Sequence, residues 1–491
     1  MPASRTYAVA ILTLVSASAS GAEPVATASE KVSYYKDVRP IFQQNCQGCH
    51  QPAKAQGGFL MIERDDLLKS GDSEKPGLVP GKPEKSFLIH EITPGKDGKI
   101  EMPKGRDPLT PEQRKLIVDW ITQGAIDDTP ASAKIAVVDE QHPPVYQAPP
   151  VVTALAFSPD GKLLAVAGFH EVLLYSADGS KLLARLIGLS ERVQSLAFSP
   201  NGKRLAVSGG APGRFGEVQI WDVETQKLKL SVPVTFDTIN GVSWSPDGSK
   251  VAFGCTDNTV RAIDPASGKQ VLQMGTHADW VLGTAFSQDG DHLISIGRDM
   301  TAKLTEVSTQ RFIDNVTSIT PGALKGGLSA LDRRPVQVKK MTKVPDDSGG
   351  TSTEKVYDEV LTAGSDGTPR LYKIHRETKR VIGDDANRVK EFAAMPGRIY
   401  SVQFDKVGRR FAATSSLDGA GEVRVYDIET AKFVTCEKAT GPAYAVAWAP
   451  EGNTVASAGF DGTVWLNDAA TGKLKKAFVV MPTAKTVTSA K

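Results

Sequence analysis

Ala154-Leu-Ala-Phe-Ser-Pro-Asp-Gly161 is a short apolar run that ends in a turn, and this pattern recurs along the rest of the chain. Close copies are Ser195-Leu-Ala-Phe-Ser-Pro-Asn-Gly202, Gly241-Val-Ser-Trp-Ser-Pro-Asp-Gly248 and Gly283-Thr-Ala-Phe-Ser-Gln-Asp-Gly290, and weaker copies start at Ser401 and Ala445. An Asp-Gly or Asn-Gly turn between apolar runs is a strong signal for a β-hairpin. The repeat therefore predicts an all-β domain of sequential antiparallel strands.

The spacing of the copies predicts the architecture of this domain. The aromatic residue before each turn is Phe157, Phe198, Trp244, Phe286, Phe404 or Trp448. The close copies lie about 40–46 residues apart, which is the length of one four-stranded propeller blade. The gap after Phe286 holds one degenerate copy with a Lys-rich insert at about residues 336–357. We therefore predict a seven-bladed β-propeller over residues 151–480.

Two further patterns connect the repeats to a known family. Third strands end in an aromatic-acid pair at Trp221-Asp222 and Tyr426-Asp427, and Gly275-Thr-His-Ala-Asp-Trp-Val281 opens the fourth repeat. In these residues the domain resembles WD40 repeats, a resemblance that is specific for the fold and says little about function. We expect the domain to serve as a platform for protein interactions. Thr305-Glu306 and Tyr372-Lys373 stand where the family has Trp-Asp, so we expect its hydrogen-bond network to be incomplete in those blades.

Cys46-Gln-Gly-Cys49-His50 is the sharpest chemical signal in the chain. The pattern C-x-x-C-H is the attachment motif of c-type haem, in which the adjacent histidine becomes an axial iron ligand. A structural zinc site would need a second Cys or His pair, and a redox disulfide would need a βαβ context. The motif therefore predicts one haem c, bonded covalently to Cys46 and Cys49 and ligated by His50.

A second axial ligand has three candidates, Met61, His90 and Met102. Met102 lies in a loop with a proline, just before the last helix of the domain, where a distal ligand is expected. Met61 lies in an apolar run that we expect to be a buried strand, and His90 is expected on a helix, pointing to solvent or to a local partner. Met102 is the favoured ligand, and an iron without a second protein ligand is the remaining alternative.

Two predicted helices bracket the motif and indicate a small all-α domain. Tyr34 to Gln44 has an apolar face and runs directly into the motif. Residues 110–124 begin with Thr110 as N-cap, Pro111 at the first position and Gln113 completing a capping box, and Gly124 ends the helix.

The domain between residues 36 and 125 resembles the Planctomycete-type cytochrome c domain. The matching segments are Val38-Arg-Pro-Ile-Phe42, Cys46 to His50, Gly57-Gly-Phe-Leu60, residues 80–88, Met102-Pro-Lys, Leu109-Thr-Pro-Glu-Gln113 and Trp120-Ile-Thr-Gln-Gly-Ala125. The resemblance implies that His50 and Met102 are the two axial ligands of the haem iron. It also implies an exported bacterial protein, because this family is fused to other modules in such proteins.

The N-terminal segment predicts export. Residues 1–22 have a basic residue, Arg5, an apolar core and small residues at Ser20 and Ala22, which is the pattern of a secretory signal peptide. An uncleaved anchor is the alternative, and no later segment has transmembrane length. We expect a periplasmic or otherwise exported protein with a cytochrome c domain at 31–128, a Pro/Ala-rich linker at 129–150 and a disordered tail at 481–491.

The remaining polar and sulfur groups predict no further site. Cys255 and Cys436 are expected to be buried small hydrophobic residues. The histidines of the repeats lie in different blades, the repeated aspartates Asp257, Asp299, Asp366 and Asp461 should stabilise turns, and the lysines of the insert, Lys339, Lys340 and Lys343, should lie on a solvated loop. The net charge of +2 predicts no strong attraction to nucleic acid.

Together these features predict an electron-transfer haem protein without its own catalytic site. Its partners would be an unidentified redox protein and a protein bound by the propeller. The alternative is a periplasmic haem enzyme or haem-based sensor whose propeller holds a substrate or a partner. A pair of histidines meeting at the central channel would favour the enzyme, and an open sixth iron position would favour the sensor.

Overall fold

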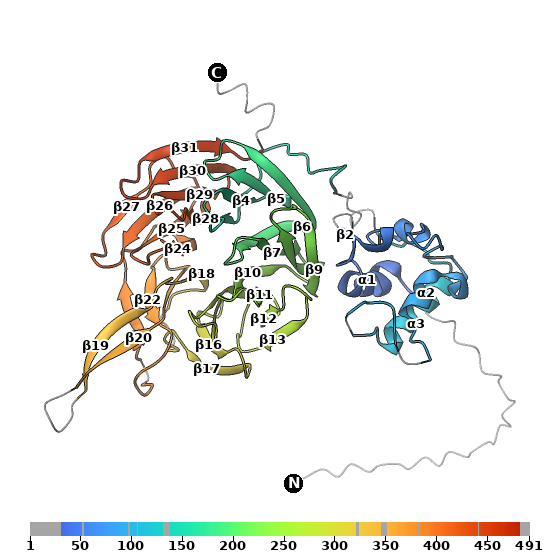
Figure 1. The fold of residues 1–491 in the computed structure, drawn as a ribbon, viewed down its shortest axis with the longest axis horizontal. Helices are drawn as coiled ribbons and strands as arrows, with labels where there is room; N and C mark the ends of the chain where they lie inside the picture. Colours follow the sequence, from blue (N-terminus) through green and yellow to red (C-terminus); the bar gives the residue numbers. More distant parts are fainter. Residues whose placement is uncertain are drawn as a thin grey trace, which may run out of the picture.

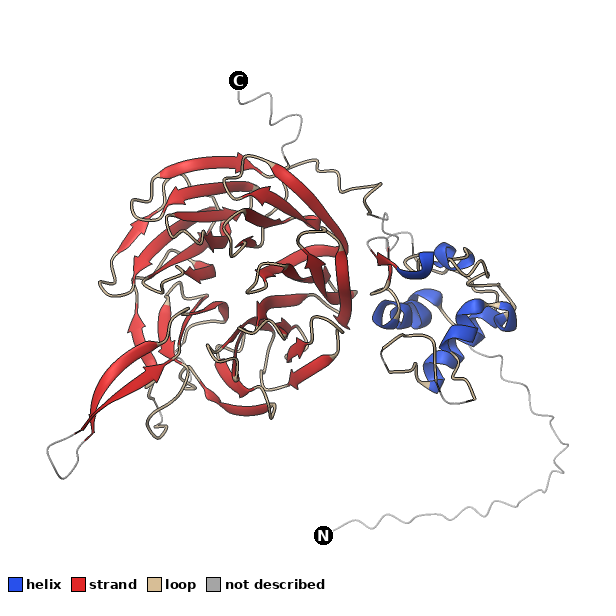
Figure 2. Cartoon of the chain, viewed as in Figure 1, coloured by secondary structure: helices blue, strands red, loops and turns tan. Residues whose placement is uncertain are grey.

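The computed structural model describes residues 31–51, 54–96, 99–105, 107–130, 138–320, 324–344, 351–381, 383–439 and 441–481. The predicted signal peptide and all but the first residue of the predicted tail lie outside these ranges. A small helical region comes first and a large region of strands follows it (Figures 1 and 2). Among the described residues, no helix has the length and apolar character needed to cross a membrane.

The helical region consists of short helices joined by turns. In chain order the elements are η1 (Tyr34–Val38), α1 (Arg39–Asn45), β1 (His50–Gln51), β2 (Lys54–Ala55), η2 (Gln56–Gly58), η3 (Arg64–Leu68), η4 (Pro83–Lys85), α2 (Phe87–Ile92) and α3 (Pro111–Thr122). The helix predicted from Tyr34 to Gln44 is present but changes character at Val38. Pro40 explains the change, because it has no N–H to donate and its ring crowds the preceding turn.

Helix α3 starts as the sequence predicts. The Thr110 hydroxyl accepts a hydrogen bond from the Gln113 amide, and the Gln113 side chain accepts one from the Thr110 amide. This capping box satisfies two N–H groups that have no partner within the helix. Past the end of the helix, Gly124 adopts a φ of 97°, a conformation that glycine reaches without steric cost.

Trp120 of α3 is the centre of the helical core. Its side chain is 0% exposed, stacks on Tyr34 at 5.1 Å and meets the edge of Phe42 at 6.3 Å between ring centroids. Its indole N–H donates to the carbonyl of Ile126 at 3.0 Å. Trp120 thus holds the segment that leads into the Cys46 motif against the last helix.

Replacing Trp120 by Ala should destabilise the helical region by about 3–5 kcal/mol, since a fully buried aromatic side chain leaves a large cavity. Urea unfolding followed by the helical circular dichroism signal measures this change. Trp280→Ala is the control, because Trp280 is 40% exposed in a loop of the strand region. Equal effects of the two substitutions would contradict the role of Trp120.

The strand region consists of consecutive antiparallel sheets. One seven-stranded sheet contains β3 (Leu155–Phe157), β4 (Leu163–Ala167), β5 (Phe169–Ser176), β6 (Leu182–Phe198), β7 (Arg204–Ala211), β8 (Phe215–Asp222) and β9 (Leu228–Thr235). Two four-stranded sheets follow: β10 (Ile239–Trp244), β11 (Val251–Cys255), β12 (Val260–Ile263) and β13 (Gln270–Met274); then β14 (Val281–Phe286), β15 (His292–Gly297), β16 (Ala302–Glu306) and β17 (Arg311–Asn315).

Three more four-stranded sheets complete the region. They are β18 (Leu328–Arg333), β21 (Glu359–Gly364), β22 (Arg370–Lys373) and β23 (Arg388–Glu391); β24 (Arg398–Phe404), β25 (Arg410–Leu417), β26 (Ala420–Asp427) and β27 (Phe433–Thr435); and β28 (Ala443–Trp448), β29 (Thr454–Gly459), β30 (Thr463–Asp468) and β31 (Leu474–Val479). Between β18 and β21, β19 (Val338–Val344) and β20 (Thr351–Tyr357) form a separate two-stranded sheet.

The sheets follow one another around a ring (Figure 2). The inner strands β3, β6, β10, β14, β18, β24 and β28 each contact the next one in this order, and β28 contacts β3. Strand β6 pairs with β5 through Leu182–Ile187 and with β7 through Arg192–Phe198, so one long strand serves two neighbouring units. This arrangement confirms the predicted all-β region and fits a propeller.

The Lys-rich insert is not the loop that we expected. Strands β19 and β20 pair in continuous register from Val338–Tyr357 to Val344–Thr351, and the hairpin projects from the ring (Figure 1). Threonine and valine recur in both strands and favour extended backbone, which explains why the lysines did not prevent pairing.

The two cysteines of the strand region are buried, as predicted. Cys255 is the last residue of β11 and Cys436 follows β27; each belongs to a buried apolar cluster, and they form no disulfide. Burial raises the pKa of each thiol to about 12, so both remain protonated small apolar groups.

The predicted WD40-type hydrogen bonds are present in one sheet but incomplete. His277 bonds through Nδ1 to the Asp299 carboxylate at 3.0 Å and through Nε2 to the Ser295 hydroxyl at 2.8 Å. Thr305, at the position where the family has tryptophan, is fully buried, and its hydroxyl has no partner. The four repeated aspartates stabilise turns as predicted, since each accepts from the amide two residues further on.

Asp299→Asn should lower the free energy of unfolding by about 2 kcal/mol at pH 7 and by about half of that at pH 3. Burial alone would raise the pKa of Asp299, but hydrogen bonds from His277, the Ala278 amide and Thr301 lower it to about 2. A carboxyl group with a lowered pKa stabilises the fold above its ordinary pKa of 3.8, and this stabilisation is lost as the pH falls toward 2.

Urea unfolding of both proteins at the two pH values measures the Asp299 effect. Asp461→Asn is the matched control, because Asp461 occupies the equivalent turn in the last sheet and accepts from the Thr463 amide at 2.9 Å. A deficit of Asp299→Asn that is independent of pH would refute the electrostatic origin of the effect.

Candidate functional site

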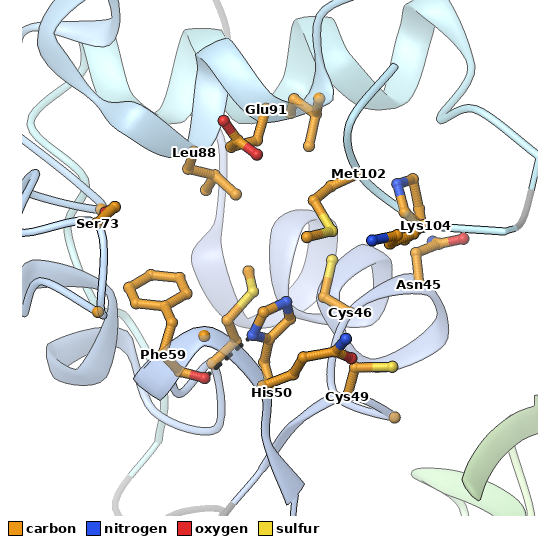
Figure 3. A pocket seen from close by; sticks show the side chains of 18 of the residues that line it. Asn45, Cys46, Cys49, His50, Phe59, Ser73, Leu88, Glu91, Met102 and Lys104 are labelled. Carbon is orange, nitrogen blue, oxygen red and sulfur yellow. Dashed lines mark hydrogen bonds between the residues drawn. The ribbon is translucent and has the colours of Figure 1, made fainter. Parts of the chain in front are cut away.

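The motif residues project into one pocket because a turn follows α1 directly. The Cys46 amide donates to the Phe42 carbonyl at 2.9 Å, which continues the helix by one residue. The amides of Cys49 and His50 then both donate to the Cys46 carbonyl at 3.1 Å. This turn places the two thiols and the imidazole along one wall of the pocket (Figure 3).

The His50 ring is held in one orientation. Its Nδ1 lies 3.1 Å from the carbonyl oxygen of Phe59, and the Phe59 ring stands at 74° to it, 5.8 Å away between centroids. Since a carbonyl can only accept, Nδ1 carries the proton and Nε2 keeps its lone pair. Burial lowers the pKa of His50, which favours the neutral ring. An imidazole in this state is a metal ligand.

Met102 lies across the pocket from His50. Its amide donates to the Glu91 carbonyl of α2 at 3.0 Å, and its half-buried side chain packs on the helical core. In the close view its thioether points into the space above the His50 ring (Figure 3). The structure therefore brings all four predicted residues, Cys46, Cys49, His50 and Met102, to one cavity.

The other two candidate ligands lie differently. Met61 lines the same pocket and is 2% exposed. We expected it in a buried strand, but it lies outside every strand of the structure. Its amide donates to the His50 carbonyl at 3.0 Å and its carbonyl accepts from the Gln47 side chain at 2.8 Å, so its backbone supports the motif instead of a sheet. His90 is on α2 as predicted, exposed beside Glu91 and outside the pocket lining.

The pocket has a volume of about 580 Å³. Phe59, Phe87, Leu88 and Ile92 supply much of its apolar lining. It is also lined by residues that sequence reasoning missed, because they belong to the strand region: Lys229, Leu230, Ala266 and Ser267. No local pattern in the sequence marks these four residues, since their place at the pocket depends on how the two regions pack.

A second cavity, of about 1040 Å³, lies among the inner strands of the ring. None of the four histidines of the strand region, His170, His277, His292 and His375, lines it. His292 and His375 do meet, with ring centroids 4.7 Å apart, but away from this cavity. The described part of the chain also holds no group of three or more His, Cys, Asp or Glu side chains suited to a metal ion.

The structure has a small helical domain with two thiols, an imidazole and a thioether around one pocket, joined to a ring of antiparallel sheets. This combination fits a cytochrome c-type domain and a propeller. Comparison with protein families agrees. Residues 46–105 match the family described as Planctomycete cytochrome C. Residues 142–180, 229–264, 268–305 and 432–468 match the WD domain, G-beta repeat. The chain is a fusion of a Planctomycete cytochrome c domain with WD40 repeats.

Similar curated proteins match parts of the WD40 region. The WD repeat-containing protein 91 homolog of Dictyostelium discoideum is 33% identical over 84 residues, which is 17% of this chain and 11% of that protein. WD repeat and SOCS box-containing protein 1 of Danio rerio is 37% identical over 84 residues, 17% of this chain and 20% of that protein. Coronin-7 of Mus musculus is 32% identical over 111 residues, which is 22% of this chain and 12% of that protein. The chain thus spans a fifth or less of the length of these relatives.

Proposed function

We propose that this chain is an exported c-type cytochrome that binds one haem covalently and transfers single electrons, with its WD40 region serving as a platform for protein partners. The observation that carries the proposal is the convergence of Cys46, Cys49, His50 and Met102 on one pocket. These four side chains supply the two attachment thiols and the two axial ligands that such a cytochrome needs.

The pocket fits the haem that the motif implies. Its volume of about 580 Å³ lies within the range of about 300–1,000 Å³ for cofactor sites. The thiols of Cys46 and Cys49 are half-buried and not bonded to each other. His50 and Met102 present a nitrogen and a sulfur from opposite sides, and the aromatic and aliphatic lining suits a flat apolar ring (Figure 3).

Haem bound there would supply a one-electron redox centre, and the residues of the chain would set its properties. The Phe59 carbonyl holds the His50 ring and increases its basicity through the hydrogen bond to Nδ1. Met102 would occupy the sixth position, a ligation that raises the reduction potential. The apolar lining limits water in the pocket and so disfavours the more highly charged oxidised state.

The ring of sheets supports a seven-bladed assignment. Seven inner strands contact one another in a closed order, and the shared strand β6 divides the seven-stranded sheet into two units of four. A rigid ring of this kind presents loops to partners, and we propose an unidentified redox protein as one of them. Export to the periplasm, or beyond the membrane, rests on the signal pattern of residues 1–22.

Spectroelectrochemical titration of the purified full-length protein tests electron transfer. We expect one haem per chain, a reversible one-electron Nernst curve and no binding of carbon monoxide to the reduced form, because Met102 would hold the sixth position. A reduced form that binds carbon monoxide rapidly would instead favour a haem enzyme or a sensor.

A further inference from the structure

The haem-type pocket is not made by the helical domain alone. Lys229 and Leu230 of β9, and Ala266 and Ser267 of the turn between β12 and β13, form part of its lining. In the close view the propeller ribbon passes on the side of the pocket where Cys49 lies (Figure 3). Two neighbouring units of the propeller therefore contribute to one wall.

Gly48, inside the attachment motif, lies directly against strand β9 of the propeller. A Cβ at this position would lie 2.4 Å from the Ser231 carbonyl oxygen and 3.2 Å from Cδ of Pro233, both in β9. Its three nearest atoms all belong to the propeller, and its φ lies outside the left-handed region. Glycine is therefore required here by the propeller and not by the turn of the motif.

Strand β9 is held rigidly at this contact. The Ser231 hydroxyl donates to the buried carboxylate of Glu217, which also accepts from Ser190 and Gln219 at 2.7 Å each. The Trp221 indole donates to Gln219 at 2.8 Å. A fully satisfied buried network of this kind fixes the position of the backbone that faces Gly48.

The segment between the domains is also fixed to the propeller. The Tyr146 hydroxyl donates to Glu171 at 2.7 Å, and Arg185 pairs with the same carboxylate through Nε at 2.6 Å. Arg185 further donates to the Pro144 carbonyl at 2.9 Å. The Glu171 side chain is 0% exposed, and Arg185 donates to both of its carboxylate oxygens, which is the strong bidentate geometry.

From these contacts we infer that the propeller forms a structural wall of the haem site and sets its reduction potential. The inference rests on the proposed haem function. The wall covers one side of the pocket, and charges on its side chains act on the charge of the iron across the pocket. The propeller is then a component of the redox centre as well as a platform.

Charges placed on the wall test this inference. Ala266→Glu should lower the reduction potential of the full-length haem protein, and Ala266→Arg should raise it, because a nearby negative charge stabilises the oxidised state. Ala470 is the matched control, since it is exposed and occupies the same Asp-x-Ala turn in the last unit, with its amide on Asp468 at 3.1 Å as that of Ala266 is on Asp264 at 2.7 Å. Equal shifts at both positions, or none at Ala266, would overturn the inference.

Gly48→Ala tests the contact between the motif and the propeller without removing a haem-binding side chain. We expect it to retain the haem, to increase amide hydrogen exchange across β9 by about tenfold or more and to lower the potential as water enters. Gly275→Ala, which has nothing within 4 Å of its Cβ, should change neither. If amide hydrogen exchange across β9 is the same in Gly48→Ala as in the wild type, the inference that the propeller forms a wall of the site is wrong. If the wild type carries no haem, the proposed function fails, but the exchange comparison still reports whether the domains are in contact.

Discussion

Substituting Cys46 and Cys49 together by serine is expected to abolish covalent haem. A serine hydroxyl does not form the thioether bond, so all haem of the double variant should be extracted by acidified acetone, whereas the wild type should retain one haem per chain. Each single variant should retain haem through one bond or lose it partly. Intact mass and haem staining after denaturing electrophoresis measure the outcome.

The control for the cysteine prediction is available in the same chain. Cys255→Ala and Cys436→Ala remove buried thiols in the propeller, and both variants should retain full covalent haem. Haem that resists extraction in the Cys46/Cys49 double variant would show attachment elsewhere. Loss of haem in either propeller variant would show that haem content reports folding and not attachment.

Met102→Ala is expected to lower the reduction potential by about 0.1–0.2 V. The choice of axial ligands changes the potentials of haem proteins over a range of about 0.8 V, so a shift of this size is expected for the loss of one ligand. The thioether of Met102 favours the reduced iron, and without it the sixth position opens to water or to added carbon monoxide. Redox titration measures the potential, and difference spectra of the reduced protein with carbon monoxide measure the opening.

Met61→Leu is the matched control for Met102, because both methionines line the pocket and leucine conserves the apolar volume. It should leave the potential within a few hundredths of a volt and should not admit carbon monoxide. A large effect of Met61→Leu with none for Met102→Ala would transfer the axial role to Met61.

The motif and the long helix could be predicted because short-range chemistry determines them. The C-x-x-C-H pattern and the Thr110–Gln113 capping box each depend on residues a few positions apart. The hairpins of the propeller were predictable for the same reason, since an Asp-Gly turn favours the pairing of its flanking strands. The irregular conformation at Met61 could not be predicted, because an apolar run fits a strand and a buried irregular segment equally well.

Long-range features could not be read from the sequence. The contact of Gly48 with Ser231 and the place of Ala266 at the pocket arise from docking of two domains, for which no periodic pattern exists. The meeting of His292 with His375 likewise depends on two neighbouring sheets. The continuity of strand β6 could not be predicted, because Gly188 and Ser190, where one unit ends and the next begins, are equally typical of a turn.

The visible spectrum of the exported wild-type protein, recorded oxidised and reduced, tests the central claim most directly. The account predicts a low-spin haem c in both states, with the weak long-wavelength band of methionine bound to ferric iron, lost in Met102→Ala. A high-spin spectrum without that band would contradict ligation by Met102, and a spectrum without haem would contradict the proposed cytochrome.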